Sequence, residues 1–362
     1  MIRRHPSHLR HTAGALIVAA LANGHANIAA AQVPRVQRVV EIGCEDCGDA
    51  RQLASTWDVA VTEAGDVLVV DRDAPTLRMF DKLGRPLWSR GRPGAGPSEY
   101  RYAMRAAVAP DGSVQVVDMR LRRLTRLARD GAVQQSLTVP FFPAGVAVRR
   151  RQGELLFLTD DFKGHGTVQR WSATAEAPVP VASFATPALG GGQTISPSIA
   201  VAPNGTVAYL ASADTYAIHR ISLTGAPLAD IVRDIPRLRR TPEEIAATER
   251  RVSSVGGAAK SEAEGKQAGG SKSLQPAENR LDLKPHASAD ALRYDDAGRL
   301  WVRTMRGTDK ATVFDLFAPS GAYEGELTVP VKVEAYALAG SYLATATERE
   351  DGVPVVVLWS VR

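Results

Sequence analysis

Four short stretches of the sequence decide the fold: WDVAVTEAG at residues 57–65, RAAVAPDG at 105–112, SIAVAPNG at 198–205 and ALRYDDAG at 291–298. In each stretch apolar residues stand at alternate positions before a glycine, which is the pattern of a half-buried β-strand that ends in a turn. A second strand follows each glycine. A further glycine comes 19 to 23 residues later, at residues 84, 131, 225 and 321. Each unit therefore contains four short strands joined by hairpin turns.

Two weaker copies of the unit, marked by Gly153 and Gly340, bring the count to six. The units recur at roughly 40–50 residues, the spacing typical of β-propeller blades. The last unit lacks a fourth strand, and residues 34–43 (PRVQRVVEIG) form a lone strand before the first unit. We therefore predict an all-β, six-bladed β-propeller in which this N-terminal strand closes the last blade and protects both open sheet edges. Deletion of residues 34–43 is expected to cripple folding.

One interval between marker glycines, from Gly205 to Gly298, is about two blade lengths. Its middle part, residues 237–288, is poor in aromatic residues and is interpreted as a helical and flexible insertion between blades four and five. Thr241-Pro-Glu-Glu244 has the N-cap, first-position proline and capping glutamate of a helix start, so we expect a short helix through about Val252. The remainder is interpreted as a surface loop, or alternatively as a lid or partner-docking arm.

The N-terminus has the order of a secretory signal. A basic segment with Arg3, Arg4 and Arg10 precedes a short apolar run, and small residues follow as far as Ala31. This order predicts a signal peptide at residues 1–31 and a mature propeller domain at 32–362, exported to the periplasm or the extracellular space. Removal of the signal lowers Lys+Arg from 44 to 41 against 39 Asp+Glu, which leaves about +2. This charge does not favour a nucleic-acid partner. No later apolar run is long enough to span a membrane, and we expect a monomer.

The sequence contains two cysteines, Cys44 and Cys47, in a Cys-Glu-Asp-Cys motif. In an oxidising export compartment the favoured interpretation is a local disulfide. The alternative is a redox motif, but four acidic residues surround the pair and would disfavour a thiolate: Glu41, Glu45, Asp46 and Asp49. A four-ligand zinc site lacks further Cys or His residues nearby.

Two longer segments resemble a known group of proteins. Residues 65–100 and 107–131 resemble NHL-type repeats, and more closely exported bacterial six-bladed propellers that carry a glycine-rich segment after the first blade, here Gly91 to Tyr100. These relatives often have an insertion with a Thr-Pro-Glu-Glu-like start before a "GRLWV" strand, which matches Thr241 to Glu244 and Gly298 to Val302. The resemblance covers the mature chain, although units three and six depart from the repeat. It implies the fold and no single chemistry.

Some carboxylates and histidines of the sequence are candidate metal ligands. Asp71 and Asp118 occupy the same repeat position, where a residue that bonds the nearby backbone suits a strand exit. Alternatively they could join Asp160, Asp161 and Asp214 around a Ca²⁺ ion. The mature chain has three histidines, His165, His219 and His286, which could meet at a Zn²⁺ ion as in propeller lyases. Neither set has a compact motif, so we expect no metal and no cofactor, with Ca²⁺ or Zn²⁺ as the alternatives.

Arginines gather in the connections expected on one face of the ring. Arg90, Arg92 and Tyr100 fall in the first connection between blades, and the second strands end at further arginines. Guanidinium groups beside aromatic rings suit carboxylates, sulfates or acidic sugars. Scattered solvated arginines are the alternative. The candidate ligand-binding residues are Arg72, Arg101, Tyr102, Arg105, Arg120, Arg303 and Arg306. Arg101→Ala and Arg303→Ala are expected to weaken binding of an anionic ligand.

The sequence thus favours a non-enzymatic exported propeller that presents one face to an anionic small molecule, a saccharide or a protein partner. A metal-dependent propeller lyase or lactone/ester hydrolase is the alternative. A third interpretation is a role in a multiprotein envelope assembly. No catalytic residue is assigned.

Overall fold

The computed structural model describes residues 33–48, 50–71, 75–141, 145–149, 153–160, 165–171, 175, 177–185, 198–210, 216–235, 238–239, 279–280 and 290–362. The chain divides into two units, Met1–Gln32 and Val33–Arg362. The predicted signal peptide and the predicted helix at residues 241–252 lie outside the described residues.

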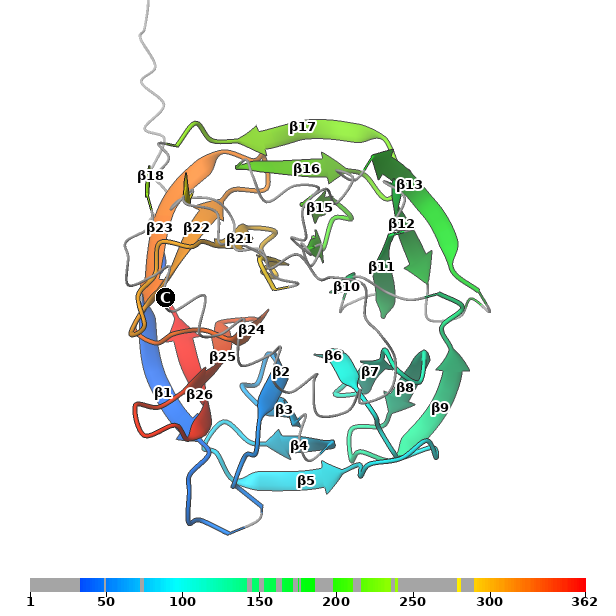
Figure 1. The fold of residues 1–362 in the computed structure, drawn as a ribbon, viewed down its shortest axis with the longest axis vertical. Helices are drawn as coiled ribbons and strands as arrows, with labels where there is room; N and C mark the ends of the chain where they lie inside the picture. The colour runs from blue at the N-terminus through cyan, green and yellow to red at the C-terminus, as the bar shows by residue number, and fades with distance from the viewer. Residues whose placement is uncertain are drawn as a thin grey trace, which may run out of the picture. The chain divides into compact units, whose positions relative to one another are not determined.

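Six four-stranded antiparallel sheets surround a central axis, each with its first strand innermost (Figure 1). Blade 1 comprises β2 (Thr56–Val61), β3 (Val67–Asp71), β4 (Thr76–Phe80) and β5 (Pro86–Arg90). Blade 2 comprises β6 (Ala103–Val108), β7 (Val114–Asp118), β8 (Arg123–Leu127) and β9 (Val133–Thr138). Blade 3 comprises β10 (Gly145–Arg149), β11 (Glu154–Asp160), β12 (His165–Trp171) and β13 (Val179–Ala185). Blade 4 comprises β14 (Ile199–Val201), β15 (Val207–Tyr209), β16 (Ala217–Ile221) and β17 (Pro227–Val232). Blade 5 comprises β20 (Leu292–Tyr294), β21 (Leu300–Arg303), β22 (Thr312–Phe317) and β23 (Tyr323–Val329). Blade 6 comprises β24 (Ala335–Ala339), β25 (Tyr342–Glu348), β26 (Pro354–Val361) and β1 (Val36–Ile42). The predicted all-β, six-bladed propeller is confirmed.

The N-terminal strand closes the ring, as predicted. β1 pairs with β26 from Val36 opposite Val361 to Ile42 opposite Val356, with one irregularity near Val40. Backbone hydrogen bonds extend the ladder, because Arg35 N donates to Arg362 O at 2.7 Å and Arg362 N donates to Arg35 O at 2.9 Å. Blade 6 therefore contains both ends of the described chain, and β26 is not left as an open edge of its sheet.

The marker glycines end the first strand of each blade because the hairpin needs a left-handed residue. Gly65 has φ +91°, and its N–H donates to Thr62 O at 3.0 Å. A Cβ atom at Gly65 would lie 3.1 Å from the ring of Tyr342 in blade 6. The turn residue thus also sets the distance between two neighbouring blades.

The apolar core lies between the blades. Among the described residues, six buried clusters each join two neighbouring sheets. Their centres include Phe80 between blades 6 and 1, Leu127 between blades 1 and 2, and Phe314 between blades 5 and 6. Alternate residues of an inner strand pack into the clusters on its two sides: in β3, Val67 and Val69 face blade 6, and Leu68 and Val70 face blade 2.

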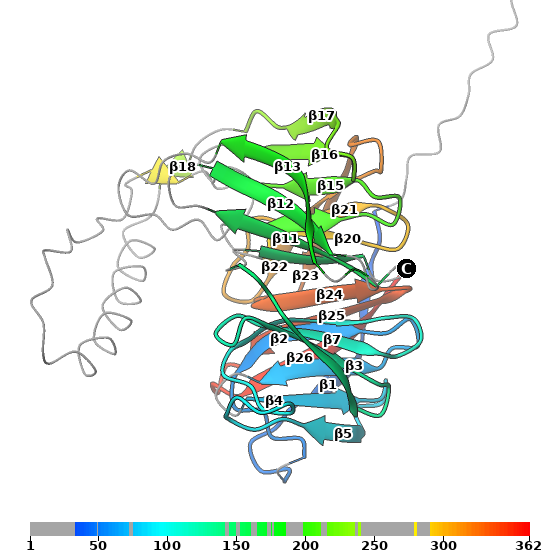
Figure 2. The ribbon, with the colours of Figure 1, turned by 90° about the vertical axis from the view of Figure 1, so that its right-hand side faces the viewer.

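Part of the predicted insertion forms a two-stranded ladder. β18 (Leu238–Arg239) pairs with β19 (Asn279–Arg280), so the chain leaves blade 4 and returns before blade 5 through adjacent strands. Figure 2, which views the ring from its edge, shows β18 outside the stack of blades. The described residues contain no helix, and in particular none long and apolar enough to cross a membrane.

Candidate functional site: the connection face

Strand order defines which loops share a face of the ring. Because neighbouring strands of a blade are antiparallel, the second and fourth strands end at the edge where the first and third begin. The connections between blades and the turns between second and third strands therefore lie on one face, which we call the connection face. Six of the seven predicted ligand-binding residues are described, and all six belong to this face or to the strand ends beside it.

Two aspartates hold equivalent loops of this face in blades 1 and 2. The buried Asp71 carboxylate accepts hydrogen bonds from Ala54 N at 2.8 Å and Ser55 N at 3.1 Å. Asp118, which lies 47 residues later, accepts bonds from Arg101 N at 2.8 Å and Tyr102 N at 3.0 Å through Oδ2.

The second oxygen of Asp118 extends this anchor. Asp118 Oδ1 accepts a bond from Leu121 N at 2.9 Å, and Met119 N donates to Tyr102 O at 3.0 Å. The carboxylate thus fastens the incoming connection to the β7–β8 turn. These contacts give both aspartates a structural role at the strand exit.

A buried ion-pair cluster crosses the axis near the connection face. Arg105 Nη1, on the innermost strand of blade 2, donates to Asp58 Oδ1 of blade 1 at 3.0 Å and also to Asp290 Oδ1 at the start of blade 5. Blades 2 and 5 are opposite each other in a six-bladed ring, so Arg105 spans the axis. Arg293 Nη2 adds bonds to Asp58 Oδ1 at 3.5 Å and Asp290 Oδ1 at 3.2 Å. We call these four residues the axial clasp.

Burial and the neighbouring opposite charges shift the pKa values of the clasp residues in opposite directions. Burial raises the pKa of Asp58 more than the nearby guanidinium groups lower it. Burial also acts to raise the pKa of Asp290, but Arg105, Arg293 and Arg303 outweigh it and hold that pKa below its usual value. For Arg105, burial lowers the pKa and the two carboxylates more than reverse this effect, so the guanidinium stays charged. The clasp is a buried network of opposite charges, and its side chains form ion pairs with one another.

The clasp borders a small cavity on the axis. The cavity has a volume of about 70 Å³ and is lined by the innermost strands of all six blades. Arg105 and Arg293 contribute guanidinium groups to a lining that otherwise consists mainly of Val, Ala, Leu and Ile residues. Because a water molecule needs roughly 10–15 Å³ measured in this way, the cavity suits a few waters or a very small ligand.

Two further predicted arginines hold blades together. Arg303 is buried, and its Nη1 donates to the carbonyl oxygens of Val333 at 2.8 Å and Glu334 at 3.0 Å, in the connection leading into blade 6. Arg306 pairs with Asp315 and Glu326 within blade 5. We expect Arg303→Ala to act first on the stability of the junction between blades 5 and 6.

The Asp315 carboxylate also joins blades 4 and 5. It accepts bonds from Tyr216 Oη at 2.7 Å and from Arg233 Nη1 at 2.8 Å, both from blade 4. The Arg233 guanidinium lies 3.9 Å from the centre of the Tyr323 ring. Arg306 therefore contributes to an inter-blade contact.

Arg101 and Arg120 differ from these arginines because both are exposed. Among the residues that the structure describes, neither forms an ion pair. The ring of Tyr102 lies 5.2 Å from that of Trp57, at a tilt of 59°, and both rings are half-buried. Arg72 lies outside the described residues.

Hydrogen bonds to Glu99 and from Arg123 of β8 hold the glycine-rich connection from Gly91 to Tyr100. Glu99 accepts bonds from Ala95 N at 2.9 Å and Gly96 N at 2.8 Å, and pairs with Arg92 at 2.8 Å. Arg123 Nη1 donates to Ala95 O at 2.9 Å and Gly96 O at 2.8 Å. The side chain of Tyr100 is buried between blades 1 and 2, and burial raises the pKa of its hydroxyl to about 12. The segment therefore seals a blade junction.

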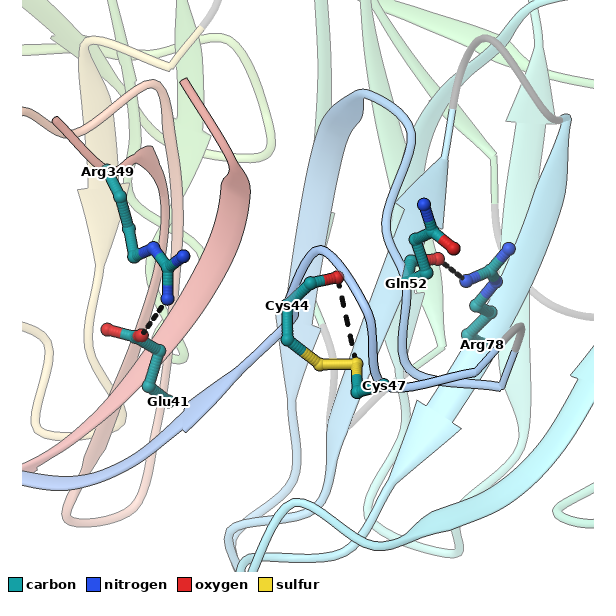
Figure 3. Close-up of a disulfide and its surroundings, with 6 residues drawn as sticks. All are labelled: Glu41, Cys44, Cys47, Gln52, Arg78 and Arg349. Carbon is teal, nitrogen blue, oxygen red and sulfur yellow. Dashed lines mark hydrogen bonds and ion pairs between the residues drawn. A yellow bond between two sulfur atoms is a disulfide. The ribbon is translucent and has the colours of Figure 1, made fainter. Parts of the chain in front are cut away.

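Cys44 and Cys47 form a disulfide in the connection from β1 to β2 (Figure 3). The half-exposed bridge follows the closing strand directly, in the same topological position as the glycine-rich connection of the next blade. Nearby, Arg349 Nη1 lies 3.8 Å from Glu41 Oε1, and Arg78 Nη1 donates to Gln52 O. The first connection is thus fastened by covalent and polar contacts.

The histidines do not form a cluster in the described residues. His219 Nδ1 lies 2.9 Å from Asp230 Oδ2, and its ring contacts that of Tyr209 on the neighbouring strand. His165 begins β12 in blade 3, whereas His286 lies outside the described residues, as do Asp161 and Asp214. No group of three or more His, Cys, Asp or Glu side chains suited to a metal ion occurs among the described residues.

Of the four residues of the axial clasp, only Arg105 was predicted as a site residue from the sequence. Asp58 stands at the same repeat position as Arg105, one unit earlier, so opposite charges at equivalent inward positions were a usable signal. Asp290 and Arg293 carried no such signal, because they lie 185 and 188 residues from Arg105 and only the closed ring brings them together. Trp57, the neighbour of Tyr102, was also missed.

Comparison with known proteins supports the fold. No family model matches the chain, and no curated protein matches it in sequence. Solved structures do match. A protein of Bacteroides fragilis described as exported is similar with a TM-score of 0.52 and 12% identity, over 90% of this chain and 95% of that one.

Two further structures extend the comparison. A gluconolactonase of Xanthomonas campestris has a TM-score of 0.51 and 14% identity, over 91% of this chain and 95% of that one. A Bacteroides thetaiotaomicron protein of unknown function has a TM-score of 0.54 and 13% identity, over 91% and 76% of the two chains. Similarity at this level of identity concerns the fold alone.

Proposed function

We propose that this chain is an exported, monomeric β-propeller that binds an anionic ligand on its connection face. The observation that carries the proposal is the difference between the predicted arginines. Arg105, Arg303 and Arg306 bond to partners within the protein, whereas Arg101 and Arg120 are exposed on two loops that Asp118 ties together, one of which carries Tyr102. Exposed guanidinium groups can form two-pronged hydrogen bonds with carboxylates and sulfates.

Export is supported by the order of basic, apolar and small residues at positions 1–31 and by the Cys44–Cys47 disulfide. A ring of blades is also a suitable scaffold for binding, because the strands fix each loop at both ends. Further contacts hold two of these loops: the disulfide lies in the connection between β1 and β2, and Asp118 accepts a hydrogen bond from the connection between β5 and β6.

The test is binding to immobilised polyanions that differ in chemistry. Dextran sulfate, polygalacturonate and polyglutamate would be compared with neutral dextran by biolayer interferometry, at several salt concentrations. We expect the protein to bind at least one polyanion, with an affinity that falls as salt increases. The Arg101→Ala/Arg120→Ala double variant should bind about tenfold more weakly or worse, a loss of about 1.4 kcal/mol.

The matched control is Arg129→Ala, which removes an exposed arginine from a turn at the opposite edge of blade 2. Its affinity should equal that of the unaltered protein. No binding to any polyanion, or equal losses in the double variant and the control, would overturn the proposal.

A further inference from the structure

Blade 2 offers an internal test of which residues the fold requires. The Asp71 and Asp118 anchors are repeats of one device, and both carboxylates accept bonds from the two residues 17 and 16 positions earlier. In blade 1 those residues are Ala54 and Ser55. In blade 2 they are Arg101 and Tyr102. Since the anchor uses only backbone N–H groups, the arginine and the tyrosine are not needed to form it.

The β7–β8 turn adds a second departure from what the fold requires. Arg122 has φ +47°, and it is the one residue other than glycine in the left-handed region among those described. An L-residue with a side chain is disfavoured in that region, where glycine is the usual choice. The turn nevertheless carries an exposed arginine, whose N–H donates to Met119 O at 3.3 Å. A strained arginine where the backbone alone favours glycine is a candidate for a functional side chain.

These residues converge on one small area. Asp118 fastens Arg101 and Tyr102 to the turn that carries Arg120 and Arg122, and Tyr102 contacts Trp57 at the start of β2. The area therefore brings together the backbones of three exposed arginines and two half-buried aromatic residues. We call these five residues the blade 2 platform.

From this arrangement we infer that the blade 2 platform binds a carboxylated polysaccharide, a chain of uronic acid residues. The inference rests on the proposed function and specifies its ligand class. A uronate repeats two features along its length: a carboxylate, which suits a guanidinium group, and an apolar C–H face, which suits an aromatic ring. A sulfated chain or an acidic peptide would use the arginines without requiring the aromatic pair.

The experiment measures affinity by isothermal titration calorimetry with three matched probes. They are a galacturonate hexasaccharide, the neutral galactose hexasaccharide, and a hexaglutamate peptide. We expect the galacturonate to bind and the neutral sugar to bind at least about tenfold more weakly, because it lacks the carboxylates. Hexaglutamate should also bind more weakly than galacturonate, because it has no sugar face.

Variants separate the aromatic and the cationic contributions. Tyr102→Leu should weaken galacturonate binding by about tenfold and leave any hexaglutamate binding unchanged. Trp57→Phe, which keeps a ring, should have a smaller effect and serves as the conservative variant. Arg122→Gly should weaken galacturonate binding about threefold while the protein remains folded. Arg129→Ala is the control and should match the unaltered protein. Thermal unfolding of each variant would identify any loss that results from misfolding.

The outcomes distinguish this inference from the proposed function. Binding of sulfated chains or hexaglutamate that depends on Arg101 and Arg120 but not on Tyr102 would overturn the uronate assignment and leave the anion-binding face intact. Absence of binding to every anionic probe would overturn both. Equal affinity for the charged and the neutral hexasaccharide would overturn the role given to the arginines.

Discussion

The loops anchored by Asp71 and Asp118 share a scaffold and differ in what they display. Each carboxylate is buried and fastens the start of its blade, so neither can be replaced without cost to the fold. One loop displays Ala54 and Ser55, and the other displays Arg101 and Tyr102. A repeat protein thus contains its own control, because residues that differ while the scaffold stays the same are candidates for function.

The same comparison separates the arginines of the connection face. Asp58 and Arg105 occupy equivalent positions in blades 1 and 2 and neutralise each other inside the ring. Arg101 and Arg120 lie a few residues away in sequence but are exposed. Burial, more than residue type or strand position, therefore decides which arginines serve the fold and which can meet a ligand.

The largest effect is expected at the axial clasp. Arg105→Ala would leave the buried carboxylates of Asp58 and Asp290 without their main partner, and should lower the free energy of unfolding by about 3–5 kcal/mol. Urea unfolding followed by circular dichroism would measure it. Arg120→Ala, in the same blade, should stay within about 0.5 kcal/mol of the unaltered protein. A similar loss in both variants would remove the distinction drawn here.

Substitution of either anchoring aspartate should lower the free energy of unfolding by a similar amount, but only one of the two substitutions should affect ligand binding. Asp71→Ala and Asp118→Ala each leave backbone N–H groups without an acceptor, and should each cost about 2–3 kcal/mol. At a temperature where both variants are folded, Asp118→Ala should lose galacturonate binding and Asp71→Ala should keep it. Equal binding in the two variants would contradict the assignment of the ligand to blade 2.

The clasp also predicts a pH dependence. The pKa of Asp290 is held below its usual 3.8, so its charged form stabilises the fold above that pH and the contribution is lost as pH falls below it. Asp290→Asn should therefore cost about 2 kcal/mol at pH 7, and the difference from the unaltered protein should shrink at pH 3. Urea unfolding at both pH values tests this, with Asp309→Asn, an exposed carboxylate of blade 5, as the control.

The pKa of Asp58 is raised, and its effect has the opposite sign. Its contribution is greatest at low pH and is lost as pH rises through the raised pKa. Because Asp58 is present in both proteins of the Asp290→Asn comparison, much of its own pH dependence cancels in the difference. A difference that grows as the solution is acidified would contradict the pKa direction assigned to Asp290.

Arg122 should show opposite changes in stability and binding. Arg122→Gly relieves the left-handed backbone strain and should raise the free energy of unfolding by about 0.5–1 kcal/mol, even as it removes a guanidinium group from the platform. Thermal unfolding would measure the gain, and Arg120→Gly, which is not in the left-handed region, should not reproduce it. A loss of stability at Arg122→Gly would mean that the side chain serves the fold.

The sequence predicted the fold because its signals are local and repeated. Gly65 and Gly112 mark hairpins that the strands need, and counting four strands per unit showed that the last unit lacked the one strand that precedes the first unit. The candidate site was predicted less completely, because strand position places Arg101, Arg105 and Arg303 on one face without stating which are buried. Arg303 meets carbonyl oxygens 30 and 31 residues away, and Arg105 meets a carboxylate 185 residues away. Those distances close only in the folded ring.

The smallest expected effect is that of copying a residue of blade 2 into the equivalent position of blade 1. Ala54 is exposed, and the bond from its N–H to Asp71 does not involve its side chain. Ala54→Arg should therefore change the free energy of unfolding by less than about 0.5 kcal/mol while placing in blade 1 the guanidinium group that blade 2 already has. If display and scaffold are independent, affinity for polygalacturonate should rise about twofold, by calorimetry at fixed salt, and Ala54→Gln should leave it unchanged. A destabilised Ala54→Arg protein would show that blade 1 displays small residues because its packing requires them.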